Sequence, residues 1–146
     1  MTTTDLAAEP AAYWTGVAYQ ALIAFTRAHL AEQGVSQPQF WLLRNLSAAD
    51  LSPDGAPMTV PELQVAMATY LRAEDDLRAE SDVLVAKGWL LRDDEGRLTI
   101  TEAGERARVA VKATTPGLRA RIHEGVDDAD YVAALGVLQR MIRNVT

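Results

Sequence analysis

The stretch from Thr59 to Gly104 decides the fold of this chain: TVPELQVAMATYLRAEDDLRAESDVLVAKGWLLRDDEGRLTITEAG. Thr59 and Glu62 form a capping-box pattern, which marks the start of a helix. Gly88 is suited to end a helix, an apolar run starts a strand after it, and Leu98 and Ile100 alternate with threonines as in a return strand. The pattern predicts a helix to about residue 68, a turn over 69–71, a helix over 72–87, and a hairpin with strands from 89 and from 98 and a turn at 94–96.

Helical spacing within this segment predicts which side chains face a core. In the first helix they are Leu63, Ala66 and Met67. On a helical wheel of the second helix, the inward side holds Ala73, Leu77, Ser81, Leu84 and Val85, and the outward side holds Arg72, Asp75, Ala79, Asp82 and Ala86, flanked by Asp76, Arg78 and Val83.

The flanking segments are predicted to be helical, so the fold class is mainly α with one small hairpin. A first helix is expected over 10–33, because Pro10 suits its first turn and Gly34 its end. Ser36 and Gln39 form another capping box, followed by a helix to Leu46 and a loop over 50–57. A helix after Thr101 is expected to bend or break at 115–117, and a last helix to begin at Asp127 or Asp128.

The two terminal helices carry more apolar surface than one neighbour can cover, which favours a dimer over packing within one subunit. The first helix has a stripe of Trp14, Val17, Ala18, Ala21, Phe25 and Ala28, and a second apolar side with Tyr19, Leu22, Ile23 and Leu30. The last helix has a seam at coiled-coil spacing, formed by Tyr131, Leu135, Leu138, Ile142 and Val145.

Composition narrows the class of protein. There is no cysteine, so disulfides and thiolate metal sites are excluded. The chain shows no secretory signal and no continuous apolar window of membrane-span length, so a cytoplasmic protein is expected. No catalytic or phosphate-binding motif is present, and His29 and His123 lack metal-ligand spacing. The acids at 127, 128 and 130 fit a helix start better than a cation site; we expect no enzyme, cofactor or metal.

The order of elements, the KGWL and LTITEAG passages around the hairpin, and the last helix beginning GVDDADYVAAL resemble the MarR family of winged helix-turn-helix regulators. The resemblance implies one domain over 1–146, with the winged helix-turn-helix at 59–101 and dimerisation helices at 10–46 and 102–146. It also implies a homodimer on a palindromic operator in double-stranded DNA, often released by a small aromatic or phenolic effector. The residues expected to present the DNA-binding face are Arg72, Arg78, Ala79, Asp82, Arg92 and Arg97.

The charge of that face departs from what DNA binding favours. The net charge of the chain is −6, whereas phosphate neutralisation needs basic residues. Ala79 and Val83 stand where relatives carry polar donors, and Arg78 could pair with Glu74 or Asp82. Arg97 could contact DNA or pair with a neighbouring acid. An alternative hypothesis is therefore a MarR-like fold with lost DNA binding that senses a ligand or binds a protein.

The resemblance also places a ligand pocket between the first two long helices. The side chains that could line it are Trp14, Tyr19, Trp41 and Arg44. The guanidinium of Arg44 could pair with a ligand carboxylate, because its fork matches that shape. The alternative is that Arg44 makes an ordinary salt bridge and that the aromatic residues belong to the core.

Overall fold

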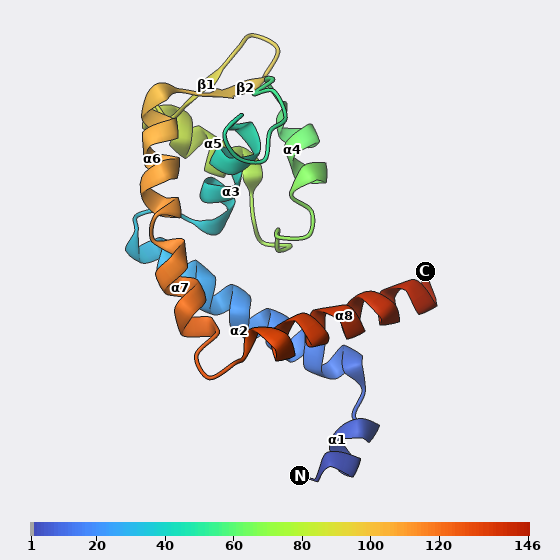
Figure 1. The fold of residues 1–146 in the computed structure, drawn as a ribbon. Helices are drawn as coiled ribbons and strands as arrows, with labels where there is room; N and C mark the ends of the chain where they lie inside the picture. The colour runs from blue at the N-terminus through green and yellow to red at the C-terminus, as the bar shows by residue number, and fades with distance from the viewer. Residues whose placement is uncertain (1) are drawn as a thin grey trace. The chain divides into compact units, whose positions relative to one another are not determined.

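A computed structural model describes residues 2–146 and divides the chain into two compact units, one through Thr114 and one over Thr115–Thr146 (Figure 1). The first unit contains α1 (Thr3–Ala8), α2 (Ala11–Glu32), α3 (Gln37–Leu46), α4 (Val60–Ala66), α5 (Leu77–Ala86), β1 (Leu90–Arg92), β2 (Leu98–Ile100) and α6 (Glu102–Lys112). The second contains α7 (Thr115–Ile122) and α8 (Asp128–Val145). None of the helices described is both long enough and apolar enough to cross a membrane.

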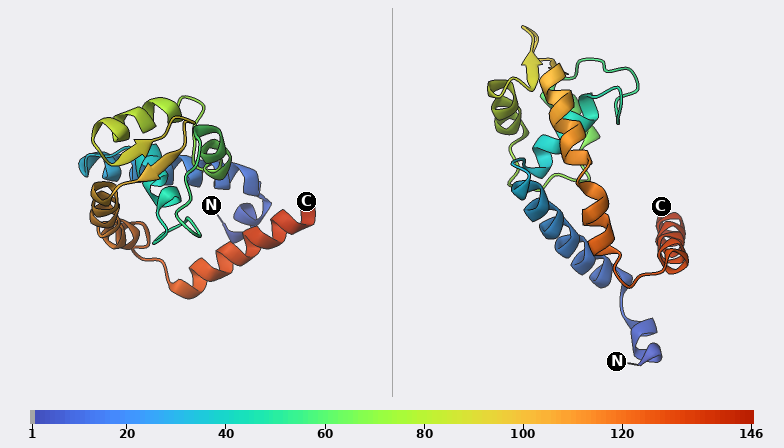
Figure 2. Two further views of the ribbon diagram at one scale, coloured as in Figure 1. Left: turned by 90° about the horizontal axis from the view of Figure 1, so that it is seen from above. Right: turned by 60° about the vertical axis from the view of Figure 1, so that its left-hand side comes forward.

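Helix α3 lies at the centre of the first unit, where it contacts α2, α4, α5, α6 and β2 (Figure 2). The predicted capping box starts it: Ser36 Oγ accepts from the backbone N–H of Gln39 at 3.1 Å. Because the apolar side chains of α3 pack against several neighbours, their burial stabilises the packing of these elements on one another. The core cluster consists of Leu42, Leu43, Leu46, Leu63, Met67, Leu77, Leu84, Leu90 and Leu98.

The hairpin is a two-stranded antiparallel sheet in the predicted place. Leu90 pairs with Ile100 and Arg92 with Leu98, and Met58 adds an isolated bridge to Leu98. The turn contains Gly96 at φ 77°, a left-handed conformation that glycine adopts without strain. Each strand has only three residues, so the wing is short.

Helix α5 begins five residues later than the sequence predicts, and this is the main difference in the winged segment. Asp76 is its N-cap and accepts from the N–H of Ala79 at 3.0 Å. Arg72 and Ala73 lie in the preceding loop, because the carboxylate of Asp75 accepts from the backbone N–H of Arg72 and holds a turn there. The predicted inward positions of Ala73 and Ala66 were wrong, since both residues are exposed.

Helix α2 matches the predicted span, and a short helix, α1, precedes it that the sequence reading did not include. The side of α2 that packs within the unit carries Ile23 and Leu30. Leu30 joins Val35, Phe40 and Val111 in a second core cluster. The first predicted stripe stays exposed, as shown by Trp14 at 44%, Val17 at 45% and Phe25 at 43%. No described residue of the first unit therefore buries this stripe.

The break between α6 and α7 falls at 113–114, just before the predicted position. Thr115, Pro116 and Gly117 form the first turn of α7, where proline is tolerated because its missing N–H is not needed. Helix α8 has Asp127 as its N-cap, without a side-chain capping bond, and it has no buried residue. Its predicted seam is correspondingly open, with Leu135 at 41% and Ile142 at 58% exposed.

Candidate nucleic-acid interface

The outward face of α5 is apolar along its middle. Leu77, Ser81 and Leu84 are buried against the core, as predicted. The opposite side exposes Ala79, Val83 and Ala86. The carboxylate of Glu80 points away from this side, because it accepts a hydrogen bond from the hydroxyl of Ser36 at the N-terminus of α3.

The charged groups of α5 are paired with one another and with the wing. Arg92 Nη1 donates to Asp82 Oδ1 at 2.7 Å, and its Nη2 donates to Ser81 Oγ at 2.7 Å. Arg78 Nε lies 3.4 Å from the same Asp82 oxygen. The hydrogen bond from Arg92 holds the pKa of Asp82 below its ordinary value. Arg92 therefore ties β1 to α5, while Arg78 is more exposed and more weakly held.

The tip of the wing is closed by its own ion pairs. Arg97 Nε donates to Asp93 Oδ2 at 2.8 Å, and Arg97 Nη2 lies 3.6 Å from Glu95. Asp93 also accepts from the backbone N–H groups of Glu95 and Arg97, and the latter bond is the main reason for its lowered pKa. The pairing of Arg97 with a neighbouring acid, which the sequence offered as an alternative, is present, and the acid is Asp93.

The loop before α5 is anchored to α2. Arg27 makes a two-bonded pair with Asp75, at 2.9 and 2.7 Å, and also donates to the carbonyl of Tyr70 at 3.4 Å. The side chain of Asp75 is only 8% exposed, and the bond from Arg27 lowers its pKa. Arg72, on this loop, lies 4.0 Å from Glu74. Sequence reasoning missed the Arg27 pair, since its partners are 48 residues apart.

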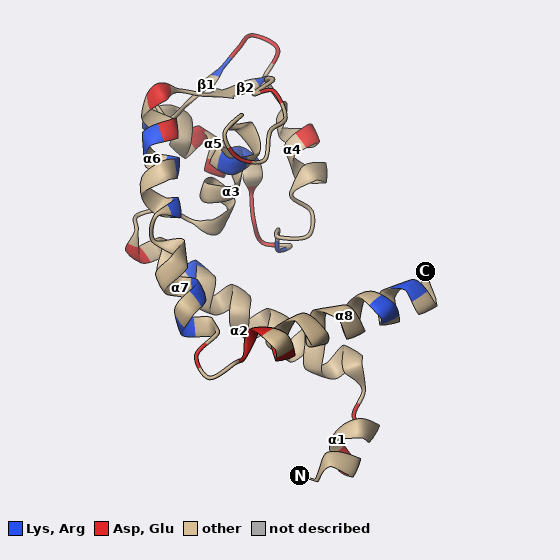
Figure 3. Ribbon diagram, viewed as in Figure 1, with Lys and Arg blue, Asp and Glu red and all other residues tan. Residues whose placement is uncertain are grey.

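Charge over the winged segment is negative. Residues 59–101 contain nine acidic and five basic residues, a balance of −4. Figure 3 shows acidic residues at the tip of the hairpin and around the start of α5. Every arginine of the segment has a carboxylate within 4.0 Å. To bind a phosphate, such an arginine must exchange one anionic partner for another.

Solved structures share this arrangement of elements. MarR from E. coli in its reduced form superposes with a TM-score of 0.67 at 20% identity, covering 92% of this chain and 93% of that one. A MarR family regulator from Silicibacter pomeroyi gives 0.69 at 16% identity, over 100% of both chains. A MarR family protein of Mycobacterium tuberculosis, solved in complex with DNA, gives 0.67 at 19% identity, covering 91% and 98%. The chain has the MarR fold. No family model matches the sequence, and no match was found among curated proteins.

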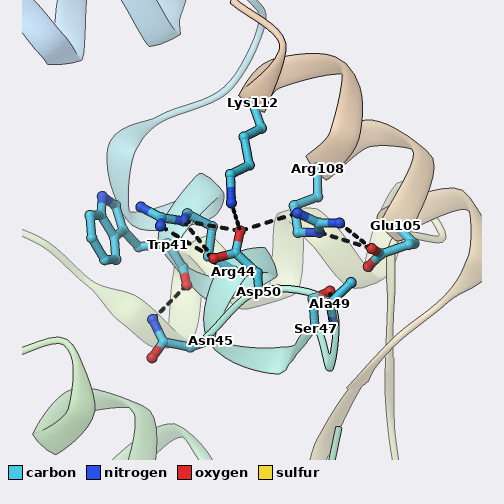
Figure 4. Close-up of polar contacts among 9 residues, drawn as sticks. All are labelled: Trp41, Arg44, Asn45, Ser47, Ala49, Asp50, Glu105, Arg108 and Lys112. Carbon is cyan, nitrogen blue, oxygen red and sulfur yellow. Dashed lines mark hydrogen bonds and ion pairs between the residues drawn. The ribbon is translucent and has the colours of Figure 1, made fainter. Parts of the chain in front are cut away.

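A partly buried ionic cluster lies between α3, the loop after it and α6; we call it the Asp50 hub and define it as Arg44, Asp50, Glu105, Arg108 and Lys112 (Figure 4). The Asp50 carboxylate is 3% exposed and accepts from Arg44 at 3.2 Å, Arg108 at 3.1 Å and Lys112 at 3.1 Å. Burial by itself raises the pKa of Asp50, but the bonds from Arg44 and Lys112 outweigh it and the pKa is lowered. Glu105 pairs with Arg108.

The hub joins three parts of the first unit. Arg44 belongs to α3, Asp50 to the following loop, and the other members to α6. Sequence reasoning anticipated a salt bridge at Arg44 but did not identify its partner. The sequence contains only a weak indication of this cluster. Asp50 is an acid in a loop, and Arg108 and Lys112 are basic residues one helical turn apart on α6.

Two of the four predicted ligand residues in this MarR fold, Trp41 and Arg44, lie against each other. Trp41 stacks on Tyr70 with ring centroids 3.8 Å apart, and the guanidinium of Arg44 lies 4.4 Å from the Trp41 ring. Tyr19 donates to the carbonyl of Thr69 at 3.3 Å. Trp14 packs edge-on against Tyr13, and across residues 2–146 it makes no ring contact or hydrogen bond with the other three.

One hollow touches this group. It has a volume of about 380 Å³ and lies between α2 and the loop before α5; its walls are Tyr19, Gln20, Leu71, Arg72, Ala73 and Glu74. Tyr19 is the only predicted ligand residue that lines it. Among the residues described, no group of three or more histidine or acidic side chains is arranged to hold a metal ion.

Proposed function

We propose that this protein is a homodimeric transcriptional regulator of the repressor type that acts in the cytoplasm, binds a palindromic operator in double-stranded DNA, and is not an enzyme. The observation that carries the proposal is the helix-turn-helix with its wing, α4, α5 and the β1–β2 hairpin, in a fold shared with a Mycobacterium tuberculosis protein solved on DNA. In such modules the second helix enters the major groove and presents its N-terminal residues to the bases.

Uncovered apolar surface supports the dimer. Tyr13, Trp14 and Val17 on α2 are between 44% and 58% exposed, and Val132, Val137 and Val145 on α8 between 53% and 84%. Several exposed large apolar side chains on one helix mark an interaction surface in soluble proteins. A second copy would cover them, and two-fold pairing of the winged segments would match the two halves of a palindrome.

Ion-pair exchange makes DNA binding compatible with the acidic surface. Arg78 and Arg97 have side chains 64% and 45% exposed, so water already screens their pairs with Asp82 and Asp93. A phosphate can replace such a carboxylate at little net cost. Arg92 is more enclosed, at 20% exposed, and we assign it to positioning α5 on the wing. Arg72 lies beside the helix start, where it can reach the backbone of the duplex.

A mobility-shift assay at low salt on fragments of the source genome tests the proposal. We expect one or a few fragments to be retarded by the wild-type protein, and Arg78→Ala and Arg97→Ala to weaken binding at least several-fold. Arg121→Ala is the matched control, because Arg121 is also exposed and paired with an acid, Glu124 at 2.7 Å, but lies on α7. No retardation of any fragment at low salt contradicts the proposal.

We further propose that a small aromatic or phenolic acid releases the DNA by binding in the hollow beside Tyr19. The hollow adjoins the loop that sets the start of α5, and Arg72 supplies a cationic group at its wall. Thermal-shift measurements with a panel of benzoates and phenols test this, with Tyr19→Phe and Arg72→Gln expected to remove the response. A ligand response that survives both variants places the effector elsewhere.

The acidic balance favours a second candidate function, a MarR fold that binds a basic protein partner in place of DNA. The balance of −4 over 59–101 is the specific observation. Charge complementarity would steer a basic partner to this face and oppose a nucleic acid. One double variant separates the two candidates. Replacing Asp93 and Glu95 by Asn and Gln should strengthen binding to DNA but weaken binding to a basic protein.

A further inference from the structure

The polar side chains of α5 are used inside the protein. Ser81 is buried, donates to the carbonyl of Arg78 at 2.7 Å and accepts from Arg92 at 2.7 Å. Glu80 accepts from Ser36. Asp82 accepts from Arg92 and lies against Arg78. Recognition of bases by hydrogen bonds needs side-chain donors and acceptors that are available to the groove. Most polar side chains of α5 already form hydrogen bonds within the protein.

Apolar groups remain uncommitted on the outward face. Ala79 and Val83 are exposed, Val83 to 42%, and lie four residues apart on the side opposite Leu77 and Leu84. Ala79 lies near the start of the helix, in the part that such modules bring to the bases, Val83 follows one turn later, and Ala86 is at the last turn. Thymine is the one base that displays a methyl group in the major groove, and small apolar side chains recognise it by contact.

We propose that Ala79 and Val83 are specificity-determining residues that recognise thymine methyl groups in the major groove. The inference rests on the proposed function and deepens it, because it names the base feature that α5 selects. Four residues span about 6 Å along a helix. Successive base pairs are about 3.4 Å apart, so the recognised thymines lie about two base pairs from each other in each half-site.

Discrimination of this kind is modest for each contact. Burial of one methyl group changes affinity by about fourfold. Arg78 adds the only exposed donor on this face of α5 that the described residues provide, and its guanidinium suits guanine. The sequence preference therefore comes mainly from methyl contacts, and phosphate contacts by the arginines set the orientation.

The test begins with selection of DNA from a random double-stranded library by the full-length wild-type protein. Each thymine of the enriched sequence is then replaced by uracil, which pairs identically and lacks only the methyl group. We expect one or two positions in each half-site at which uracil weakens binding about fourfold, and no effect at the others.

Variants assign the contacts. Val83→Ala removes two methyl groups and does not lower helix propensity, so the affinity loss from uracil at one position should disappear. Val65→Ala is the matched control: the same change on α4, at a side chain 80% exposed, should leave the whole uracil profile intact.

Three outcomes separate this inference from the proposed function. If no library sequence is enriched, the proposed DNA binding fails and the inference fails with it. If DNA is enriched but uracil has no effect at any thymine, regulation through DNA stands and the methyl assignment is wrong. If Val83→Ala keeps the full wild-type uracil profile, another element recognises the thymines and the assignment to Val83 is overturned.

Discussion

Replacement of Asp50 by asparagine is the sharpest test of how the first unit is held together. The carboxylate of Asp50 is 3% exposed and lies within 3.2 Å of nitrogen atoms from Arg44, Arg108 and Lys112. Asparagine has nearly the same shape, so Asp50→Asn removes the charge and leaves the packing in place. Its side-chain oxygen can still accept one or two of the bonds.

The size of the effect follows from how enclosed each partner is. Arg108 is 6% exposed, and breaking a buried pair of this kind costs about 3–5 kcal/mol when the partner is left alone. Here Glu105 still pairs with Arg108, which reduces the cost. Arg44 and Lys112 are 22% and 47% exposed, so water replaces part of what they lose. We expect a loss of about 2–3 kcal/mol in the free energy of unfolding.

The loss should depend on pH in a defined direction. The pKa of Asp50 is lowered in the folded protein, so the unfolded chain binds a proton at Asp50 more readily than the folded chain does. The stabilisation from its charge is complete above about pH 4, the ordinary aspartate range, and declines as the pH falls through the folded pKa. The difference between wild type and Asp50→Asn should therefore shrink below about pH 4.

Thermal unfolding followed by circular dichroism measures both features. At pH 7 we expect the midpoint to fall by about 5–10 °C. Asp94→Asn is the control, because Asp94 is exposed on the wing and makes no hydrogen bond or ion pair within residues 2–146. A midpoint for Asp50→Asn within about 1 °C of the control, or a difference that stays constant from pH 7 to pH 3, would refute the reasoning.

Three further predictions concern the winged segment and the helices α2 and α6. Gly104→Ala should destabilise the fold by about 3 kcal/mol in urea unfolding, because its Cβ would lie 2.1 Å from a backbone oxygen; Gly117→Ala, with nothing within 4 Å, should not. Arg27→Met should cost about 2 kcal/mol at pH 7 and less below about pH 4, where the lowered pKa of Asp75 ceases to contribute; a pH-independent loss contradicts this. Asp82→Asn should raise affinity for the selected DNA about two- to fivefold in fluorescence anisotropy; weaker binding would make the carboxylate a positioning group.

Local patterns predicted most of the fold. Both predicted capping boxes, at Ser36 and Thr59, start helices. Gly88 and Gly96 have left-handed backbone conformations, at the places where the end of a helix and a turn were expected. These features depend on a few neighbouring residues, which is why sequence reveals them. The predicted start of α5 was wrong, because Arg72 and Ala73 continue the helical spacing of the sequence. A distant residue, Arg27, instead fixes this stretch as a loop through its bonds to Asp75.

Only part of the ion pairing at the candidate interface was predictable from the sequence. Arg78 with Asp82 and Arg97 with Asp93 are i,i+4 neighbours, and such pairs can be anticipated from spacing. The pair of Arg92 with Asp82, ten residues apart, could not be predicted without knowing that β1 packs on α5. The Asp50 hub joins residues up to 62 apart, and an acid in a loop carries no signal of such partners.

The position of Asp50 changes the meaning of the loop between α3 and α4. Connecting segments of this kind are normally the first choice for inserting a tag or a cleavage site. Because Asp50 and Arg108 are 58 residues apart and both enclosed, their ion pair ties the loop to α6, and we expect the two to open together. An insertion beside Asp50 would therefore release the helix that follows the wing, and amide protons of α6 would lose their protection from exchange together with those of the loop.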